Sequence, residues 1–425
     1  MSETVSEHGG VEGKGAMLAR IPSTGRHRVL IIGGGTAGIC VAARLARAGQ
    51  KDVAIIEPSA HHYYQPLWTL VGAGVARVED TVRDEARYIP KGVKWIQDWA
   101  QEVDPVARTV STRGGQTLGY DFLVVAPGIQ LDWDKVRGLR EALESRPNVS
   151  SNYDVRYAPK TWEMIRAFRG GTALFTHPAT PVKCAGAPQK IMYLAADHFR
   201  KHGLQDSAHV VFASAGKAIF GVKEYAAVLE QVVKRYGIDT RFQHNLVEVR
   251  GEKNEAVFVR ALADGASEQV VLPYDLLHAC PPQSAPDFIQ NSPLAWRDGP
   301  SRGWVKADKY TLRHPDHPEV FALGDASDLP TSRTGAAIRK QAPVLVKNLL
   351  AVMEGREPTA TYDGYASCPL TTGYGKLLLA EFGYEGKPTP TFPLIDSIRE
   401  RRDMWLLKKY GLPRLYWELM LRGRA

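Results

Sequence analysis

A glycine-rich turn near the start of the chain limits the fold more than any other feature of the sequence. Gly33, Gly35 and Gly38 have the spacing G-x-G-x-x-G, between a short apolar strand expected at 28–32 and a helix expected at 39–48. In this motif the first glycine permits a tight turn, the second lets the backbone approach a diphosphate, and the third allows close packing of helix on strand. The start of the helix offers free N–H groups to the diphosphate. The motif therefore predicts a βαβ unit that binds a dinucleotide.

An acidic residue in the next strand strengthens this prediction. Glu57 ends the strand expected at 53–56, where its carboxylate can accept hydrogen bonds from the hydroxyls of an unphosphorylated ribose. Gly34, inside the turn, belongs to the same predicted cofactor site. The alternative, a chance glycine turn, is disfavoured because strand, helix and acid all occur in the expected order.

Strands and helices continue to alternate along the chain, which predicts an α/β fold with parallel sheets covered on both faces. Further strands are expected at 120–126, 172–176, 209–214, 276–279 and 320–323, with helices at 189–202 and 335–354. Two such blocks predict two Rossmann-like dinucleotide-binding domains, the first of them split and completed late in the chain. The expected division is a flexible leader at 1–27, the first part of the cofactor domain at 28–150, a second Rossmann-like domain at 151–295, the completion of the first at 296–358, and a C-terminal region at 359–425.

A second candidate cofactor segment follows the strand expected at 320–323. Gly324 and Asp325 stand where that strand ends, at the edge of the sheet where ligands bind. The pair resembles the second FAD fingerprint of flavoproteins with two dinucleotide-binding domains, in which the Asp holds the ribityl and phosphate end. Thr334 and Gly335 stand at the start of the next helix, whose N-terminal dipole would stabilise negative charge on a reduced flavin. The simpler alternative for Asp325 is a helix cap or a turn residue.

The second block lacks the glycine fingerprint that a nicotinamide cofactor would need. After the strand at 209–214 the chain reads AGKAIFG (215–221), in which the glycine spacing is wrong for G-x-G-x-x-G. The domain is expected to keep the fold without that ligand, which points to an electron donor other than NADH.

The four cysteines include no C-x-x-C pair, so neither a zinc site nor a disulfide scaffold is indicated. Cys184 stands beside a lysine and just before a helix start, an environment that lowers the pKa of a thiol. Cys368 is expected in a non-regular stretch bounded by proline, and the sequence does not show whether the two thiols meet. Cys40, inside the first helix, and Cys280 are interpreted as small buried apolar residues, although the loop position of Cys280 leaves its role open.

The chain has 54 Lys and Arg against 46 Asp and Glu, a formal net charge of +8. A solvated basic surface would explain this excess, and so would an acidic partner. A membrane surface fits better than nucleic acid, because no run of Lys and Arg interleaved with aromatic residues forms a nucleic-acid platform. No run of 18 apolar residues occurs, and residues 1–27 have no apolar core typical of a secretory signal.

The C-terminal segment MWLLKKYGLPRLYWELMLR (404–422) mixes Trp, Tyr and Leu with basic residues. Such a segment can lie in the headgroup region of a membrane with its Lys and Arg side chains outward. The alternative is a C-terminal helix that completes the core.

Nearly the whole chain, from the glycine turn to Arg424, resembles the mitochondrial-type (type II) sulfide:quinone oxidoreductases. The longest similar segments are HYYQPLWTLVGAG (62–74), TPVKCAGAPQK (180–190), GDASDLPTSRT (324–334) and YDGYASCPLTTGY (362–374). These matches are long and specific, whereas the glycine turn alone occurs in many families.

The resemblance implies a set of roles for residues of this chain. Cys184 and Cys368 would be the redox cysteines, bridged at rest directly or through an extra sulfur. Hydrogen sulfide would form a persulfide on Cys368 and release Cys184 as the thiolate that passes electrons to FAD. Lys190 and Lys408 would be supporting cations, with ordinary solvated lysines as the alternative. The implied cofactor residues are Gly33, Gly34, Gly35, Gly38, Glu57, Gln65, Ala100, Gly324, Asp325, Thr334 and Gly335, with no metal.

The implied partners are a membrane quinone, a lipid surface and a small sulfur acceptor such as glutathione, sulfite or cyanide. The expected location is peripheral on a bacterial inner membrane, or on the mitochondrial inner membrane in a eukaryote. Competing functions are a type II NADH:quinone dehydrogenase, a flavin-bearing assembly protein without turnover, and an exported flavocytochrome sulfide dehydrogenase. The missing second glycine fingerprint argues against the NADH dehydrogenase. The paired cysteines argue against the assembly protein, and the lack of a secretory signal argues against the exported flavocytochrome.

Overall fold

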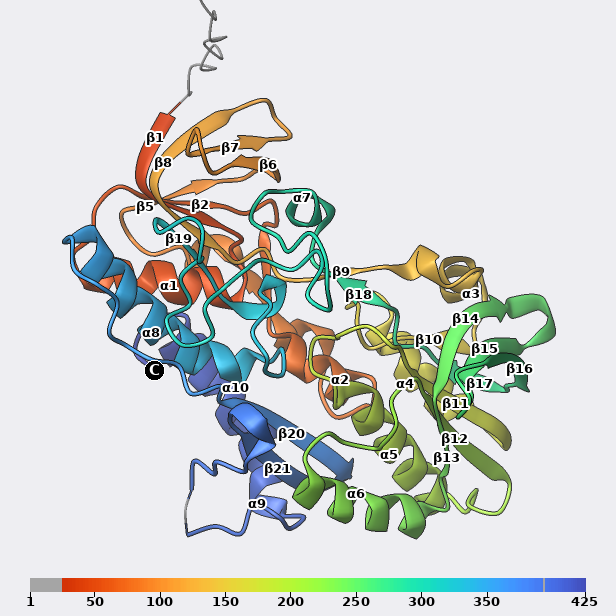
Figure 1. Ribbon diagram of the computed structural model, residues 1–425. Helices are drawn as coiled ribbons and strands as arrows, with labels where there is room; N and C mark the ends of the chain where they lie inside the picture. Colours follow the sequence, from red (N-terminus) through yellow and green to blue (C-terminus); the bar gives the residue numbers. More distant parts are fainter. Residues whose placement is uncertain (1–24, 393) are drawn as a thin grey trace, which may run out of the picture.

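Two Rossmann-like sheets lie side by side in the computed structural model, which describes residues 25–392 and 394–425 (Figure 1). The expected leader at 1–27 falls mainly on residues outside this description, and residues 25–27 already belong to the first strand, β1 (Gly25–Ile32). The α/β prediction is confirmed, and the two sheets correspond to the two blocks predicted from the sequence.

The first sheet has the strand order β5-β2-β1-β8-β7-β6, with β19 paired to β8. Its strands after β1 are β2 (Val53–Ile56), β5 (Val93–Ile96), β6 (Ala100–Asp104), β7 (Thr109–Thr112), β8 (Thr117–Val125) and β19 (Val320–Ala322). Strands β2 and β8 lie on either side of β1 and run parallel to it. Strand β19 pairs with β8 in parallel, with Val320 opposite Leu123. Strands such as β2 are buried along their length, as parallel strands covered on both faces are. The antiparallel pair β6–β7 was not expected from the sequence.

Two helices pack together on one side of this sheet, α1 (Thr36–Arg47) and α8 (Gly335–Met353) (Figure 1). Helix α1 starts directly after the glycine turn, and α8 starts after the loop that follows β19. Their N-termini therefore approach the carboxyl ends of β1 and β19, which is the edge at which such sheets bind ligands.

The second sheet has the parallel order β10-β17-β11-β12-β13. Its elements are β10 (Val149–Ser150), α4 (Ala158–Ala167), β11 (Gly171–His177), α5 (Ala187–Lys201), β12 (Ala208–Ser214), α6 (Lys223–Tyr236), β13 (Asp239–Phe242) and β17 (Leu276–His278). An antiparallel sheet of β14 (His244–Arg250), β15 (Glu255–Ala261) and β16 (Ser267–Pro273) is attached to it. The loop at 215–222 separates β12 from α6, so the tight strand-to-helix turn of a nucleotide fingerprint is absent there.

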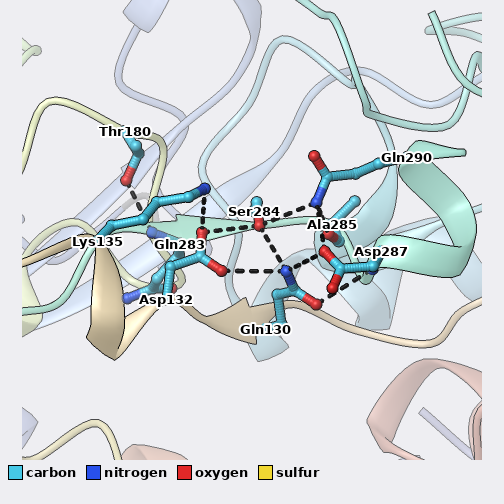
Figure 2. A network of polar contacts seen from close by, with 9 residues as sticks. All are labelled: Gln130, Asp132, Lys135, Thr180, Gln283, Ser284, Ala285, Asp287 and Gln290. Carbon is cyan, nitrogen blue, oxygen red and sulfur yellow. Dashed lines mark hydrogen bonds and ion pairs between the residues drawn. The ribbon is translucent and has the colours of Figure 1, made fainter. Parts of the chain in front are cut away.

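The chain crosses between the two sheets through two short antiparallel strands, β9 (Gln130–Leu131) and β18 (Gln283–Ser284). A network of polar side chains holds this crossing together (Figure 2). Gln130 donates to Ser284 and Asp287, and Ser284 donates to Asp132. Smaller elements before and around the crossing are β3 (His61–Tyr63), α2 (Trp68–Val71), β4 (Val82–Asp84), α3 (Leu139–Ser145) and α7 (Asp287–Gln290).

The C-terminal region forms a ribbon of β20 (Ala366–Gly373) and β21 (Lys376–Phe382), followed by a wound segment with α9 (Arg402–Leu406) and α10 (Leu412–Arg414). The expectation that Cys368 lies in a non-regular stretch is wrong, because it pairs with Ala380 inside this ribbon. Pro369 does not prevent the strand, since a two-stranded ribbon leaves one edge of each strand unpaired. Two π-helical turns, Leu407–Gly411 and Leu415–Met420, flank α10, where Pro413 cannot donate to the helix.

One face of the C-terminal helix completes the core, and another is exposed. Trp405 and Trp417 are buried, whereas Leu406 and Tyr410 are 48% and 60% exposed. The alternative of a core-completing helix therefore holds for the first face, and only the second is free to meet a lipid surface. In the part of the chain that the structure describes, no helix is long and apolar enough to cross a bilayer.

Candidate active site

The glycine turn has the shape that a dinucleotide diphosphate requires. Gly33 has a φ of +97°, and a Cβ there would lie 2.3 Å from the carbonyl oxygen of Ala126. A Cβ on Gly38 would lie 1.8 Å from the carbonyl oxygen of Gly33, so both positions exclude a side chain. Gly35 is exposed and has no protein atom within 4 Å of where its Cβ would be. The turn is closed toward the sheet and open toward the crevice, which fits the diphosphate of FAD.

Glu57 stands at the carboxyl end of β2 and accepts hydrogen bonds from two backbone N–H groups. Gly34 N donates to Oε2 at 2.7 Å, and Ser59 N donates to Oε1 at 2.8 Å. Burial raises the pKa of Glu57, and the two N–H donors oppose this effect. Each carboxylate oxygen keeps acceptor capacity for a ribose hydroxyl.

The second candidate segment stands at the other side of the same crevice. Gly324 has a φ of +75°, and its N–H donates to Oε1 of Gln341 on α8 at 3.0 Å. Burial raises the pKa of Asp325, whose neighbours include Arg333. Thr334 caps α8, because its Oγ1 accepts from Ala337 N at 3.2 Å.

The remaining predicted cofactor residues are placed less distinctively. A Cβ on Gly335 would meet no protein atom within 4 Å, so the start of α8 is open. Gln65 is exposed in the turn Gln65–Leu67, and Ala100 is half-buried at the start of β6. Contact of these three residues with the cofactor stays a prediction.

The fold brings the two predicted redox cysteines together. Cys184 comes from the loop before α5, Cys368 comes from β20, and their Sγ atoms lie 3.6 Å apart. A disulfide bond is about 2.05 Å long, so the two thiols are in contact without being bridged, and a small side-chain rotation would close the bond. Cys368 is 1% exposed.

Backbone pairing across the crevice positions Cys184. Its N–H donates to the carbonyl oxygen of Arg333 at 2.7 Å, just before the start of α8. The N–H of Lys183 donates to Oε1 of Gln283 at 2.9 Å. Gln283 N donates in turn to Oγ1 of Thr180 at 2.9 Å (Figure 2). Cys184 itself has a φ of +51°, a strained conformation for a residue with a side chain. The crossing strand β18 and the loop before α8 therefore hold the cysteine from two sides.

Gly186 makes room for the second sulfur. A Cβ at this position would lie 2.5 Å from Sγ of Cys368 and 2.4 Å from Cδ2 of Leu370. Any larger residue would therefore push the β20 ribbon away from the loop that carries Cys184.

The two thiols have opposite acidities because they share one proton and one cation. The hydrogen-bond contact with Cys368 and the ammonium of Lys190, whose Nζ lies 2.9 Å from Sγ of Cys184, lower the pKa of Cys184 below its ordinary value despite burial. The same hydrogen bond, followed by burial, raises the pKa of Cys368. Burial lowers the pKa of Lys190, but the attraction of the two sulfurs outweighs burial and raises it. Cys184 is therefore the thiolate of the pair.

A second buried lysine stands near the pair. Lys408 is 3% exposed, as is Lys190, so the alternative of ordinary solvated lysines is wrong for both. Burial, and then repulsion by Lys190, lowers the pKa of Lys408 to about 7. Its Nζ donates to the carbonyl oxygen of Pro66 at 3.4 Å. The side chain thus points inward from the C-terminal helix, against the expectation that the basic residues of this segment face outward.

The other two cysteines are buried, and Cys280 lies near Lys183 and Cys184. Cys40 and Cys280 are 2% and 1% exposed, and burial raises the pKa of both thiols, that of Cys40 to about 12. Both lie among buried apolar residues, as the sequence interpretation expected.

Sequence reasoning missed the residues that position the cysteines. Gly186 and Thr180 lie inside the similar segment 180–190, but nothing in their spacing indicates a contact with Cys368 or Gln283. Arg333 contributes a backbone carbonyl, which leaves no signal in the sequence.

The sequence is similar to one known family model and to several known proteins. The family model described as pyridine nucleotide-disulphide oxidoreductase matches residues 27–161. The mitochondrial sulfide:quinone oxidoreductase of Mus musculus is 46% identical over 93% of this chain and 87% of its own length. The chain belongs to the sulfide:quinone oxidoreductase family. The family resemblance of the four segments is thereby confirmed, and with it an FAD-dependent oxidoreductase.

Two further relatives agree with this assignment. The mitochondrial sulfide:quinone oxidoreductase of Dictyostelium discoideum is 44% identical over 93% of this chain and 86% of its own length. The solved structure of the sulfide:quinone oxidoreductase from the bacterium Aquifex aeolicus matches with a TM-score of 0.76. It covers 93% of this chain and 92% of its own chain at 19% identity, which supports the shared fold.

We expect the variant Lys190→Met to raise the pKa of Cys184, because the cation that stabilises the thiolate is removed. Alkylation of Cys184 in the reduced protein, followed against pH by mass spectrometry, would then be slower at neutral pH. Lys201→Met is the matched control, since Lys201 is an exposed lysine on the same helix and should leave the profile unchanged. An unshifted profile in Lys190→Met would contradict this electrostatic assignment.

We expect Gly186→Ala to lower the free energy of unfolding by about 1–3 kcal/mol and to slow formation of the Cys184–Cys368 bridge, because the added methyl group overlaps Cys368. Chemical denaturation and mass spectrometry of the oxidised protein measure the two effects. Gly221→Ala is the control, since a Cβ there meets no atom within 4 Å. If the bridge formed in Gly186→Ala as fast as in the wild type, the space beside Cys368 at residue 186 would not control bridge formation.

Proposed function

We propose that this chain oxidises sulfide at the Cys184–Cys368 pair and passes the two electrons through FAD to a membrane quinone. The observation that carries the proposal is the contact of the two sulfurs at 3.6 Å, with Lys190 at 2.9 Å from Cys184. Membership of the sulfide:quinone oxidoreductase family supports the overall reaction, and the geometry of the site supports the roles of the single residues.

In the bridged state, hydrosulfide attacks Sγ of Cys368 and breaks the bond to Cys184. The products are a persulfide on Cys368 and a thiolate on Cys184, and the lowered pKa of Cys184 makes it the better leaving group. If the bridge holds an extra sulfur, the same attack leaves that sulfur on one of the two cysteines. The choice of Cys368 as the attacked sulfur follows from the opposite acidities of the two thiols.

A nucleophilic acceptor such as glutathione, sulfite or cyanide then removes the outer sulfur from Cys368. The thiolate of Cys184 and the thiol of Cys368 then re-form their bond and release two electrons and one proton. FAD held at the glycine turn would supply a two-electron acceptor between the cysteine pair and the quinone. In sum, sulfide loses two electrons, the quinone gains two electrons and two protons, and the protein returns to its bridged form.

Lys190 and Lys408 have different tasks in this scheme. Lys190 keeps its charge and stabilises each thiolate formed at Cys184. Lys408, with a pKa of about 7, can hold a proton at Nζ and release it near neutral pH. We assign to Lys408 the supply of a proton on the side of the site formed by the C-terminal helix.

The alternative of a type II NADH:quinone dehydrogenase is disfavoured by the segment between β12 and α6, in which the loop at 215–222 replaces a tight glycine turn. An assembly protein without turnover would not need a lowered thiol pKa beside a buried lysine.

Anaerobic titration tests these alternatives together. Sulfide should bleach the flavin spectrum and NADH should not, and a soluble quinone should restore the colour. Bleaching by NADH alone would overturn the proposal.

The proposed division of the chain follows the two sheets except at 149–150, where β10 pairs with β17 of the second sheet. Segments 28–150 and 296–358 would form the FAD-binding domain, because β19 completes the sheet of β1 and β8. Segment 151–295 would form the second Rossmann-like domain, and 359–425 would supply Cys368, the quinone side of the site and the membrane contact.

For the membrane contact we propose a surface made of Phe392, Leu394, Ile398, Leu406 and Tyr410, all of which are exposed. Phe392 and Met404 line the same small cleft, so the loop after β21 packs beside α9. Lys and Arg outnumber Asp and Glu across 384–414, which suits an anionic lipid surface. The location would be peripheral, on the mitochondrial inner membrane in a eukaryote or the inner membrane of a bacterium.

Replacing either redox cysteine by serine should lower sulfide-dependent quinone reduction by at least about a thousandfold, because a hydroxyl cannot carry the sulfur exchange. FAD should stay bound and reducible by dithionite in both variants. Cys40→Ser is the control, since a serine hydroxyl can still donate to the carbonyl of Met420, as the thiol does. Retained turnover in Cys184→Ser would refute the scheme.

Charges introduced on the proposed lipid surface should release the protein from vesicles. The double variant Leu394→Asp/Leu406→Asp should lose most co-sedimentation with vesicles of mixed zwitterionic and anionic lipid, because two exposed apolar contacts become negative. Val106→Asp is the control, because Val106 is a strongly exposed aliphatic residue on the β6–β7 turn, far from α9 (Figure 1). Unchanged sedimentation of the double variant would place the lipid contact elsewhere.

A further inference from the structure

The hydroxyl of Tyr416 joins the C-terminal helix to the glycine turn at the other end of the sequence. It lies 2.8 Å from Oγ1 of Thr36 and 2.6 Å from Nε2 of His62. Thr36 is the first residue of α1, directly after Gly35. Tyr416 and His62 are both 3% exposed, so neither side chain exchanges these contacts with bulk water.

A buried carboxylate determines which group donates and which accepts in each of these hydrogen bonds. Nδ1 of His62 lies 2.9 Å from Oε2 of Glu85, and both side chains are 2% exposed. Because a carboxylate accepts, Nδ1 carries a proton and donates to Glu85. Nε2 can then accept from the Tyr416 hydroxyl, whose oxygen accepts in turn from the Thr36 hydroxyl. The hydroxyls of Thr36 and Tyr416, both ring nitrogens of His62 and Oε2 of Glu85 then all have a partner.

The helix that carries Tyr416 lies along α1 beyond this single contact. The thiol of Cys40 donates to the carbonyl oxygen of Met420 at 3.3 Å, and Arg44 donates to the carbonyl oxygen of Ala425. A Cβ on Gly423 would lie 3.0 Å from the backbone of Ala43 and Arg44. The last residues of the chain therefore pack on the helix whose N-terminus faces the cofactor crevice.

We propose that Tyr416 is a positioning residue for the dinucleotide cofactor. By holding the Thr36 hydroxyl away from the crevice, it fixes the first turn of α1 so that its unpaired N–H groups point at the diphosphate. The C-terminal helix is thus part of the FAD site as well as of the quinone and lipid side. The proposal rests on FAD binding at the glycine turn and not on the sulfur chemistry, so the two can fail separately.

Flavin retention tests the proposal without turnover. Tyr416→Phe and Thr36→Val each remove one hydroxyl, and each should weaken FAD binding roughly fivefold to tenfold, the effect of one buried hydrogen bond. Reconstitution of the apoprotein with FAD gives the dissociation constant, and the rise of free-flavin fluorescence after dilution gives the release rate. Tyr410→Phe, on the exposed face of the same helix, should bind FAD as the wild type does.

The double variant Tyr416→Phe/Thr36→Val separates positioning from a general loss of stability. If the two hydroxyls act as one unit, the double variant should bind FAD no more weakly than the worse single variant. Additive losses would overturn the proposal, as would wild-type FAD retention in Tyr416→Phe or an equal loss in Tyr410→Phe. Loss of sulfide turnover in Cys184→Ser with normal FAD retention would agree with the proposal that Tyr416 positions the cofactor, because it would show that FAD binding does not depend on the sulfur chemistry.

Discussion

The contact between the sulfurs of Cys184 and Cys368 depends on segments that are distant in the sequence, so no local sequence pattern predicts it. One sulfur comes from the loop before α5, and the other comes from a ribbon that follows both sheets. The contact needs a left-handed backbone at Cys184 and a missing side chain at Gly186. A strained residue of this kind costs about 1–3 kcal/mol and persists only where its surroundings hold it. The hydrogen bonds to Arg333 and Gln283 supply that support.

The buried cations around the pair stabilise negative charge on sulfur. Burial, and then repulsion by Lys190, lowers the pKa of Lys408 to about 7, so this buried cation is destabilised unless negative charge lies nearby. Lys190 stays charged because the thiolate of Cys184 lies beside it. A hydrosulfide, a thiolate or a persulfide would each offset the same unfavourable burial. A preference for reduced sulfur would therefore depend on the lysines as well as on the cysteines.

The C-terminal helix contacts two parts of the structure that are distant from it in the sequence and keeps one face exposed. Its inner face carries Lys408 toward the cysteines and Tyr416 toward the glycine turn, while Leu406 and Tyr410 remain outside. An amphipathic segment of this composition is typical of a lipid-facing helix, which is why the sequence favours that interpretation. The buried aromatic residues show that the same composition also suits a helix that closes a core. Composition does not separate the two cases, because Trp and Tyr are favourable in both settings.

The sequence by itself determined those strands, turns and helices that depend only on residues close together in the chain. The glycine turn, β1, α1, β2 and the start of α8 were predictable because strand, turn and helix follow one another within a few residues, and each glycine has a steric reason. The strand around Cys368 and the β6–β7 pair were missed, since their pairing residues come from separate segments. Only the tertiary structure decided that the cysteines meet, that Lys190 and Lys408 are buried, and that Tyr416 contacts Thr36. Those contacts join residues that are distant in the sequence, and they depend on how the sheets, the ribbon and the last helix pack, which no spacing along the chain records.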